Sequence, residues 1–179
     1  MKKIQFFFLA SVLLLQSIFS LRAQNTEGRE FWISFSYRNT IQNITLKIRF
    51  VSGIQPASIN IYFTALSKNV SFDIAPHEVF EYVLDEIEMA AVLSFETGTT
   101  YKSVHIRTSA PLSVYAYLQN QQYIEATNIL PATTLSTEYY HISCHTFDLP
   151  SNPPDAYLVV ATQNNTQLRH NNDIVANLR

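Results

Sequence analysis

The stretch SAPLSVYAYLQN, residues 109–120, alternates apolar and polar side chains behind a proline. Its apolar row consists of Leu112, Val114, Ala116 and Leu118. Successive side chains of a β-strand point to opposite faces of the sheet, so this period of two predicts a half-buried strand. Pro111 donates no ladder hydrogen bond and is expected at the beginning of the strand or at a sheet edge.

The preceding stretch, YKSVHIRT (101–108), alternates in the same way, with Val104 and Ile106 on its apolar row. Because only a short connection separates the two stretches, they are predicted to form an antiparallel hairpin with a shared inner face.

The same alternation recurs along the chain, and it predicts an all-β fold. It is clear in REFWISFSY (29–37), ITLKIRFVS (44–52) and SINIYFTA (58–65). Gly53 and Pro56 between the last two predict a hairpin loop. Further strands are expected at 70–74, 79–84, 139–144 and 157–162. Short strands at this spacing predict an antiparallel β-sandwich-like domain, with part of a larger β-propeller or barrel as the alternative.

Three stretches differ from this pattern. DEIEMAAVLSF (85–95) combines helix formers with an acidic start and predicts one short helix. AYLVVAT (156–162) is nearly all apolar and predicts a central strand that is buried on both sides. QNNTQLRHNNDIVANLR (163–179) restarts an alternating strand and then stops, which indicates a domain that is incomplete at its C-terminus.

The first 23 residues predict a secretory signal peptide. Two lysines precede an apolar run from residue 4 to 21, and Ala23 closes the segment. An uncleaved membrane anchor is the competing interpretation, because the run is about long enough to span a bilayer. The domain organisation expected is therefore a signal peptide at 1–23 and one β domain at 24–179, with secretion or cell-surface display as the destination.

The charge of the exported chain argues against a nucleic-acid partner. Removal of Lys2, Lys3 and Arg22 leaves 9 basic against 14 acidic residues, a formal charge of −5. The remaining basic residues are scattered singly, whereas polyanion binding needs clustered lysine and arginine. A membrane is expected to contact the chain only through the signal segment during export. Cys144, the one cysteine, cannot form an internal disulfide and is expected to be a small core residue.

Catalytic and metal chemistry find little support in the sequence. His141, Cys144 and His145 are zinc or copper ligand types, but on a strand Cys144 points away from the two histidines. Asp148 and Asp155 could serve as the carboxylate pair of a glycosidase, although beside prolines they are more simply turn formers. No phosphate loop, nucleophile elbow or metalloprotease helix is present. We therefore expect no catalytic residue, no metal and no cofactor.

The tyrosines on the polar rows are the candidate ligand contacts. Tyr62, Tyr115 and Tyr117 are expected to face outward. They either pack across neighbouring strands with wet hydroxyl groups or line a partner surface, since tyrosine is enriched at interfaces.

Four blocks in a fixed order carry a family resemblance. They are GREFW (28–32), HIRTSAPLSVYA (105–116), ATNILP (126–131) followed by Leu135 and Glu138-Tyr139-Tyr140, and VVAT (159–162) followed by Asn165 and Thr166. Together they resemble the N-terminal domain of IgGFc-binding proteins. The resemblance covers residues 28–166, roughly the first half of that family's domain, so it implies a truncated copy.

The resemblance implies a role in binding or adhesion without catalysis. Family members occur in animal mucus proteins and in secreted or surface proteins of Bacteroidetes-type bacteria, and the double-lysine signal and single cysteine fit a bacterial member. The expected partner is an extracellular protein or glycan, with host mucin or immunoglobulin as examples, and no ligand-contact residue is carried over. The alternatives are a structural module of a longer surface protein and an extracellular carbohydrate-active enzyme.

Overall fold

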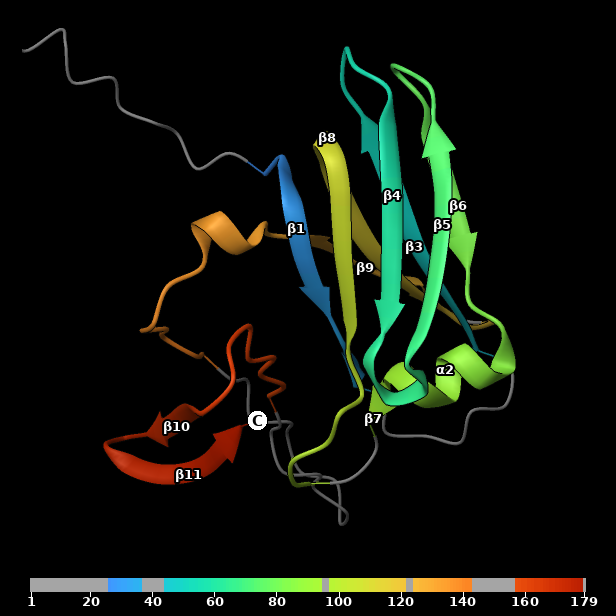
Figure 1. Cartoon of the computed structure of the whole chain (residues 1–179). Coiled ribbons are helices and arrows are strands. Elements are labelled where there is room, and N and C mark those ends of the chain that lie inside the picture. Colours follow the sequence, from blue (N-terminus) through green and yellow to red (C-terminus); the bar gives the residue numbers. More distant parts are fainter. Residues whose placement is uncertain (1–25, 37–43, 95–96, 122–123, 143–156, 179) are drawn as a thin grey trace, which may run out of the picture.

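The computed structural model describes residues 26–36, 44–94, 97–121, 124–142 and 157–178. They form an all-β fold around one seven-stranded antiparallel sheet (Figure 1). Its strands are β1 (Gly28–Ile33), β3 (Thr45–Ser52), β4 (Ala57–Phe63), β5 (Lys68–Ile74), β6 (Val79–Val83), β8 (Val104–Gln119) and β9 (Ile124–Ile129).

Smaller elements complete the described part of the chain. They are the parallel pair β2 (Phe35–Ser36) and β7 (Leu93–Ser94), the hairpin β10 (Thr166–His170) and β11 (Asp173–Leu178), helix α2 (Glu86–Val92), and the 3₁₀ turns η1 (Thr64–Leu66) and η2 (Ala132–Thr134). None of the helices in these ranges has the length and apolar character that crossing a bilayer requires.

Strand β8 organises the sheet because its two halves have different neighbours. Residues 104–108 pair with β1 on one side and β4 on the other, whereas residues 112–119 pair with β3 and β9. The expected hairpin between 101–108 and 112–118 is therefore wrong, since both stretches belong to one 16-residue strand. Pro111 lies inside this strand, so the expectation that it stands at a strand beginning or a sheet edge is wrong. Its missing N–H group is tolerated because residues 109–111 have no partner in the register between the two pairing zones.

The sheet curls at this point, so its two halves face each other. Figure 1 shows β1, the first half of β8, β4 and β5 side by side in front, and we call them the front layer. The second half of β8 with β9, β3 and β6 forms the back layer. The two layers give the molecule its sandwich-like form, as the sequence predicted.

The connection at 53–56 is not a hairpin loop. β3 and β4 do not pair with each other; β3 pairs with β6 and β8, and β4 pairs with β5 and β8. The connection instead carries the chain from the back layer to the front layer. A hairpin and a layer-to-layer turn need the same glycine and proline chemistry, so the local sequence does not distinguish them.

The apolar rows of both layers meet in a single core. Phe31, Ile61 and Ile106 from the front layer and Ile48, Phe50 and Val114 from the back layer are all fully buried. Aromatic rings bridge the layers along one side: Phe72 on β5 lies 4.5 Å from Phe80 on β6 and 5.6 Å from Phe50, measured between ring centroids. The alternation read from the sequence thus gave the correct inner faces.

The short helix that the sequence predicted at 85–95 is present as α2, and it closes one end of the core. Asp85 is its N-cap: the Asp85 side chain accepts a hydrogen bond from the Glu88 N–H, and the Glu88 side chain accepts one from the Asp85 N–H. This capping box satisfies two of the amide donors that a helix start leaves unpaired. Met89 and Val92 are buried against the sheet.

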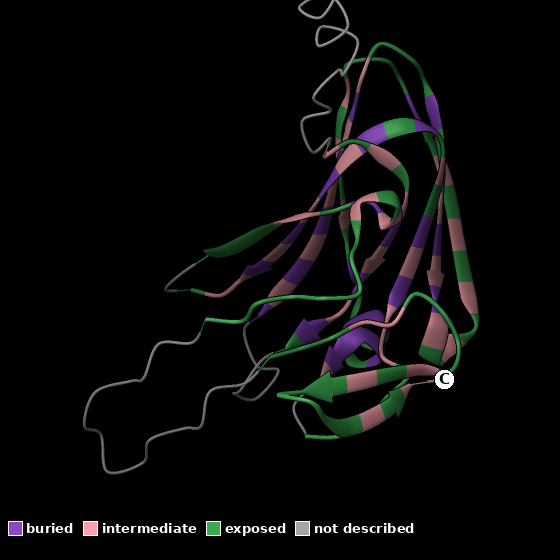
Figure 2. Ribbon diagram, turned by 90° about the vertical axis from the view of Figure 1, so that its left-hand side faces the viewer, coloured by how far each residue is buried: buried purple, intermediate pink, exposed green. Residues whose placement is uncertain are grey.

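The C-terminal third, residues 120–179, adds little to the apolar core: in its described part Ile129 on β9 packs against the core and is only partly buried. All buried hydrophobic residues of the described ranges lie between Phe31 and Leu118. Residues 139–142 and 157–162 form no strand, contrary to the sequence prediction. In the run expected to be a doubly buried strand at 156–162, the described Tyr157, Leu158 and Val159 are 44%, 43% and 44% exposed. The described residues cover this run only in part, since the Tyr157 ring packs against the rings of His141 and His170. Figure 2 shows the β10–β11 hairpin as exposed and intermediate only.

Candidate binding faces

Tyr115 and Tyr117 lie on the outer face of the back layer. In the register Tyr115 is directly opposite Arg49 on β3 and Tyr117 is opposite Lys47. On the next strand, β6, Glu81 is opposite Arg49. The exposed Val79 and Val83 lie two residues before and two residues after Glu81, on the same face. We call this surface the tyrosine face, and its members are Lys47, Arg49, Val79, Glu81, Val83, Tyr115 and Tyr117.

Arg49 holds the centre of the tyrosine face together. Its guanidinium group donates to Glu81 Oε1 from Nε at 2.9 Å and from Nη2, and it donates to the Tyr117 hydroxyl group at 2.8 Å. The guanidinium carbon also lies 4.5 Å from the centroid of the Tyr117 ring, a cation–π contact. The hydrogen bond with Arg49 lowers the pKa of the Glu81 carboxyl group. Arg49 therefore fixes the orientation of Tyr117.

The two tyrosines of this face differ in what they offer a partner. Tyr117 packs across the strands against Arg49, and its hydroxyl group accepts a hydrogen bond from that side chain. Tyr115 is half-buried, and its hydroxyl group makes no hydrogen bond among the described residues. Val79 and Val83 beside them are 59% and 53% exposed. The face thus combines the ring of Tyr117, held by Arg49, with the hydroxyl group of Tyr115, which has no partner among the described residues, and with two exposed valines.

Tyr62 lies on the opposite side of the molecule. It belongs to β4, and its cross-strand neighbours on the outer face of the front layer are His105 on β8 and Asn69 on β5. The structure therefore brings Tyr115 and Tyr117 together and separates Tyr62 from both. The three residues cannot form one contact surface, although all three point outward as the alternation predicted.

The outer side of the front layer is composed of hydrogen-bonding and aromatic side chains. We call it the polar face, and its members are Glu30, Trp32, Ser58, Asn60, Tyr62, Asn69, Ser71, Asp73, His105, Arg107 and Ser109. The ring of Trp32 stacks on that of His105 with centroids 4.0 Å apart, and the His105 Nε2–H donates to Glu30 Oε1 at 2.8 Å. This stack holds one edge of the face rigid.

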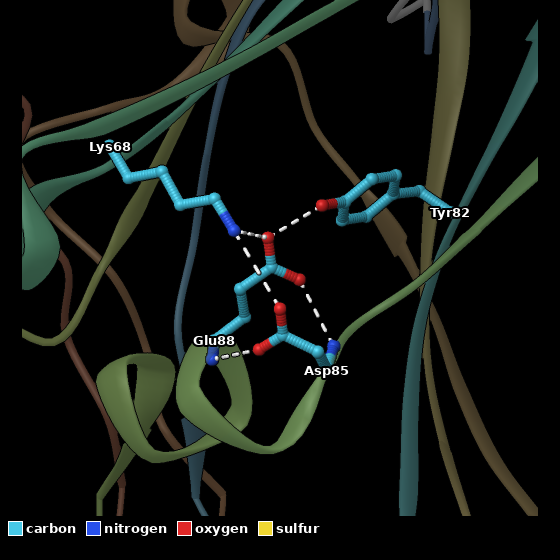
Figure 3. Close-up of polar contacts among 4 residues, drawn as sticks. All are labelled: Lys68, Tyr82, Asp85 and Glu88. Atoms are coloured by element: carbon cyan, nitrogen blue, oxygen red, sulfur yellow. Dashed lines mark hydrogen bonds and ion pairs between the residues drawn. The ribbon is translucent and has the colours of Figure 1, made fainter.

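Among the described residues, Glu88 is the most deeply buried ionisable one, with 1% of it exposed. Figure 3 shows its carboxylate among three donors: the Tyr82 hydroxyl group at 2.6 Å, Lys68 Nζ at 2.8 Å and the Asp85 N–H at 3.0 Å. Burial and the hydrogen bond to Glu88 raise the pKa of Tyr82, and the Glu88 N–H lowers the pKa of Asp85. The donors come from β5, from β6 and from the start of α2, so the Glu88 carboxylate links these three elements.

The residues considered for metal binding and hydrolysis mostly fall outside the described ranges. This holds for Cys144, His145, Asp148 and Asp155, whereas His141 is described and exposed. Within the described ranges, no three histidine, cysteine, aspartate or glutamate residues lie close enough to hold a metal ion.

Sequence reasoning missed the polar face and the role of Arg49. The alternation did place each of these residues outward, so the signal was present strand by strand. What it lacked was the pairing: Arg49 meets Tyr117, and Trp32 meets His105, only once β8 is known to be shared by both layers.

The chain was compared with protein-family models, curated proteins and solved structures. No family model matches it, no curated protein matches it, and no solved structure matches it.

Proposed function

We propose that this chain is a secreted or cell-surface binding module without catalytic activity, and that its tyrosine face contacts a protein partner. The observation that carries the proposal is the arrangement of Tyr115 and Tyr117 around Arg49, next to the exposed Val79 and Val83. Tyrosine and arginine are the residue types enriched at the centre of protein interfaces. The signal-like N-terminus and the resemblance to the N-terminal domain of IgGFc-binding proteins support an extracellular setting.

The rigidity of the face favours recognition of a folded partner. Both tyrosines stand on the central strand of the back layer, which is paired on both sides. A pre-ordered face loses little conformational entropy on association, which leaves more of the contact energy as affinity. The proposal includes the absence of catalysis. Its support is that the carboxylate of the buried Glu88 is already hydrogen-bonded to Lys68, Tyr82 and Asp85.

The test is retention of protein comprising residues 24–179, which includes every described residue, on immobilised immunoglobulin G, Fc fragment and mucin. We expect at least one ligand to retain it. The double variant Val79→Glu/Val83→Glu should weaken that binding at least tenfold by placing charge on the face. Ile87→Glu makes the same change at a 68% exposed position on α2 and should leave binding intact. No retention by any ligand, or equal loss in the two variants, would contradict the proposal.

A second candidate function is a structural module of a longer surface protein. The exposed apolar side chains of the C-terminal third favour it, among them Tyr140 at 94%, Ile142 at 90% and Val159 at 44%. Such side chains are normally covered by another polypeptide. This candidate predicts strong fluorescence of an apolar dye with residues 24–179 and little with residues 24–136; weak dye binding by both would contradict it.

A further inference from the structure

The polar face forms a grid whose chemistry differs from that of the tyrosine face. Its first row across the strands is Trp32, His105, Tyr62 and Asn69, and its second row is Glu30, Arg107, Asn60 and Ser71. A third row holds Ser58 and Asp73, and Ser109 accepts a hydrogen bond from the Ser58 N–H at 2.8 Å. Every member is aromatic or hydrogen-bonding and none is aliphatic, which is unusual for a protein-binding surface.

A shallow depression of about 230 Å³ opens on this face between β4 and β5. It is lined by Ser58, Ile59, Asn60, Ser71, Phe72 and Asp73. Clefts for drug-sized molecules are roughly 300–1,000 Å³ and more enclosed. The depression therefore suits a single small ring that lies on the surface as part of a longer chain.

The polar groups at the depression can both donate and accept. Asn60 Nδ2 donates to Ser71 Oγ at 2.9 Å, which fixes the amide and leaves its oxygen as an acceptor. Asp73 offers an exposed carboxylate, and the side chain of Arg107 makes no ion pair or hydrogen bond among the described residues. A ligand that satisfies this set must itself carry several groups that donate and accept, as the hydroxyl groups of a sugar do.

The charges of the face favour a neutral sugar over an acidic one. Glu30 is directly opposite Arg107 in the register and bonds to His105, and Asp73 adds a second carboxylate nearby. Two carboxylates against one guanidinium group leave no positive field to attract a sugar acid. Tyr62, half-buried one row from Asn60, presents an aromatic ring on which the apolar side of a sugar ring can pack.

We propose that the polar face is a binding site for a neutral oligosaccharide, with Asn60, Asp73 and Arg107 as its hydrogen-bonding residues and Tyr62 as its aromatic platform. This site lies on the opposite side of the curled sheet from the tyrosine face, so the inference does not depend on the protein-binding proposal. Binding to one exposed ring is weak, and repetition of the sugar along a glycan raises the apparent affinity.

The test uses immobilised neutral hexasaccharides of glucose, mannose, xylose and N-acetylglucosamine, with hyaluronan and polygalacturonate hexasaccharides as acidic probes. We expect protein 24–179 to bind at least one neutral probe and no acidic probe. Asp73→Ala and Arg107→Ala should each weaken that binding roughly tenfold, since each removes a hydrogen bond to the ligand.

Matched controls separate the site from general effects on the protein. Asp173→Ala removes an exposed carboxylate from β11, and Arg29→Ala removes an exposed guanidinium group from β1 outside the polar face. Both should bind as the unaltered protein does, and so should Val79→Glu/Val83→Glu. Binding of no neutral probe, stronger binding of acidic probes, or unchanged affinity in Asp73→Ala and Arg107→Ala would overturn the inference, whatever the outcome with immunoglobulin or mucin.

Discussion

Replacement of Glu88 by alanine should destabilise the domain by about 3 kcal/mol. The loss of a charged acceptor for the half-buried Tyr82 hydroxyl group contributes roughly 1.5–3 kcal/mol. The loss of half of the capping box at Asp85 contributes roughly 0.5–1 kcal/mol. The contact with Lys68 adds less than either of these, because 42% of that lysine side chain is exposed and water replaces the lost partner.

The matched control is Glu86→Ala, which removes an acidic residue from the same first turn of α2. Glu86 is exposed, so only its interaction with the helix dipole is lost, roughly 0.3–1 kcal/mol. Urea denaturation followed by circular dichroism gives both free energies of unfolding, and an unchanged slope with urea keeps the comparison valid. Equal effects of the two substitutions, or a loss below about 1 kcal/mol in Glu88→Ala, would refute the buried network as a stabilising element.

Three further outcomes follow from the described contacts. The pKa of Asp85 and that of Glu81 are lowered in the folded state, so the stability they contribute is present above their unfolded values and is lost as the pH falls below about 4; a free energy of unfolding that stays level from pH 6 to pH 3 would contradict this. Gly28→Ala would place a Cβ 2.2 Å from the Cβ of Pro131, so roughly 1–3 kcal/mol of destabilisation is expected in thermal unfolding, against no change if the two segments are not in contact. Removal of residues 143–179 should leave one cooperative unfolding transition near its original midpoint, because the buried core cluster of the described residues ends at Leu118, and loss of that transition would show that residues 143–179 hold the fold.

The strands could be predicted because each one carries its own alternation. The row Leu46, Ile48 and Phe50 is buried as expected, and so is the row Leu112, Val114, Ala116 and Leu118. The start of α2 could also be predicted from its acidic residues and helix formers, and the capping box of Asp85 and Glu88 shows why the helix begins there. These are local signals, in which side chains a few residues apart determine the outcome.

The pairing of the strands could not be predicted in the same way. The turn residues at 53–56 predict a hairpin loop and Pro111 predicts the start or edge of a strand, but each stands where the chain passes from one layer to the other. Which strand lies beside β8 depends on contacts between residues far apart in the sequence, such as Gly28 with Leu112 between β1 and β8. The polar face could not be predicted for the same reason, because its rows form only across four strands.

The C-terminal third shows a further limit of pattern reading. The run at 156–162 has the composition of a buried central strand, yet its described residues form no strand. An apolar run becomes a strand only where another strand offers hydrogen bonds and cover, and no described strand pairs with this run.

The most direct test of the account is where a retained protein partner touches the molecule. Isotope-labelled protein 24–179 can be titrated with whichever of immunoglobulin Fc or mucin retains it, and the loss of amide NMR signal intensity mapped by residue. The account predicts losses centred on the outer face of the back layer, at 47–51 and 113–117. Losses confined to the connection at 53–56 or to residues 157–178 would contradict it.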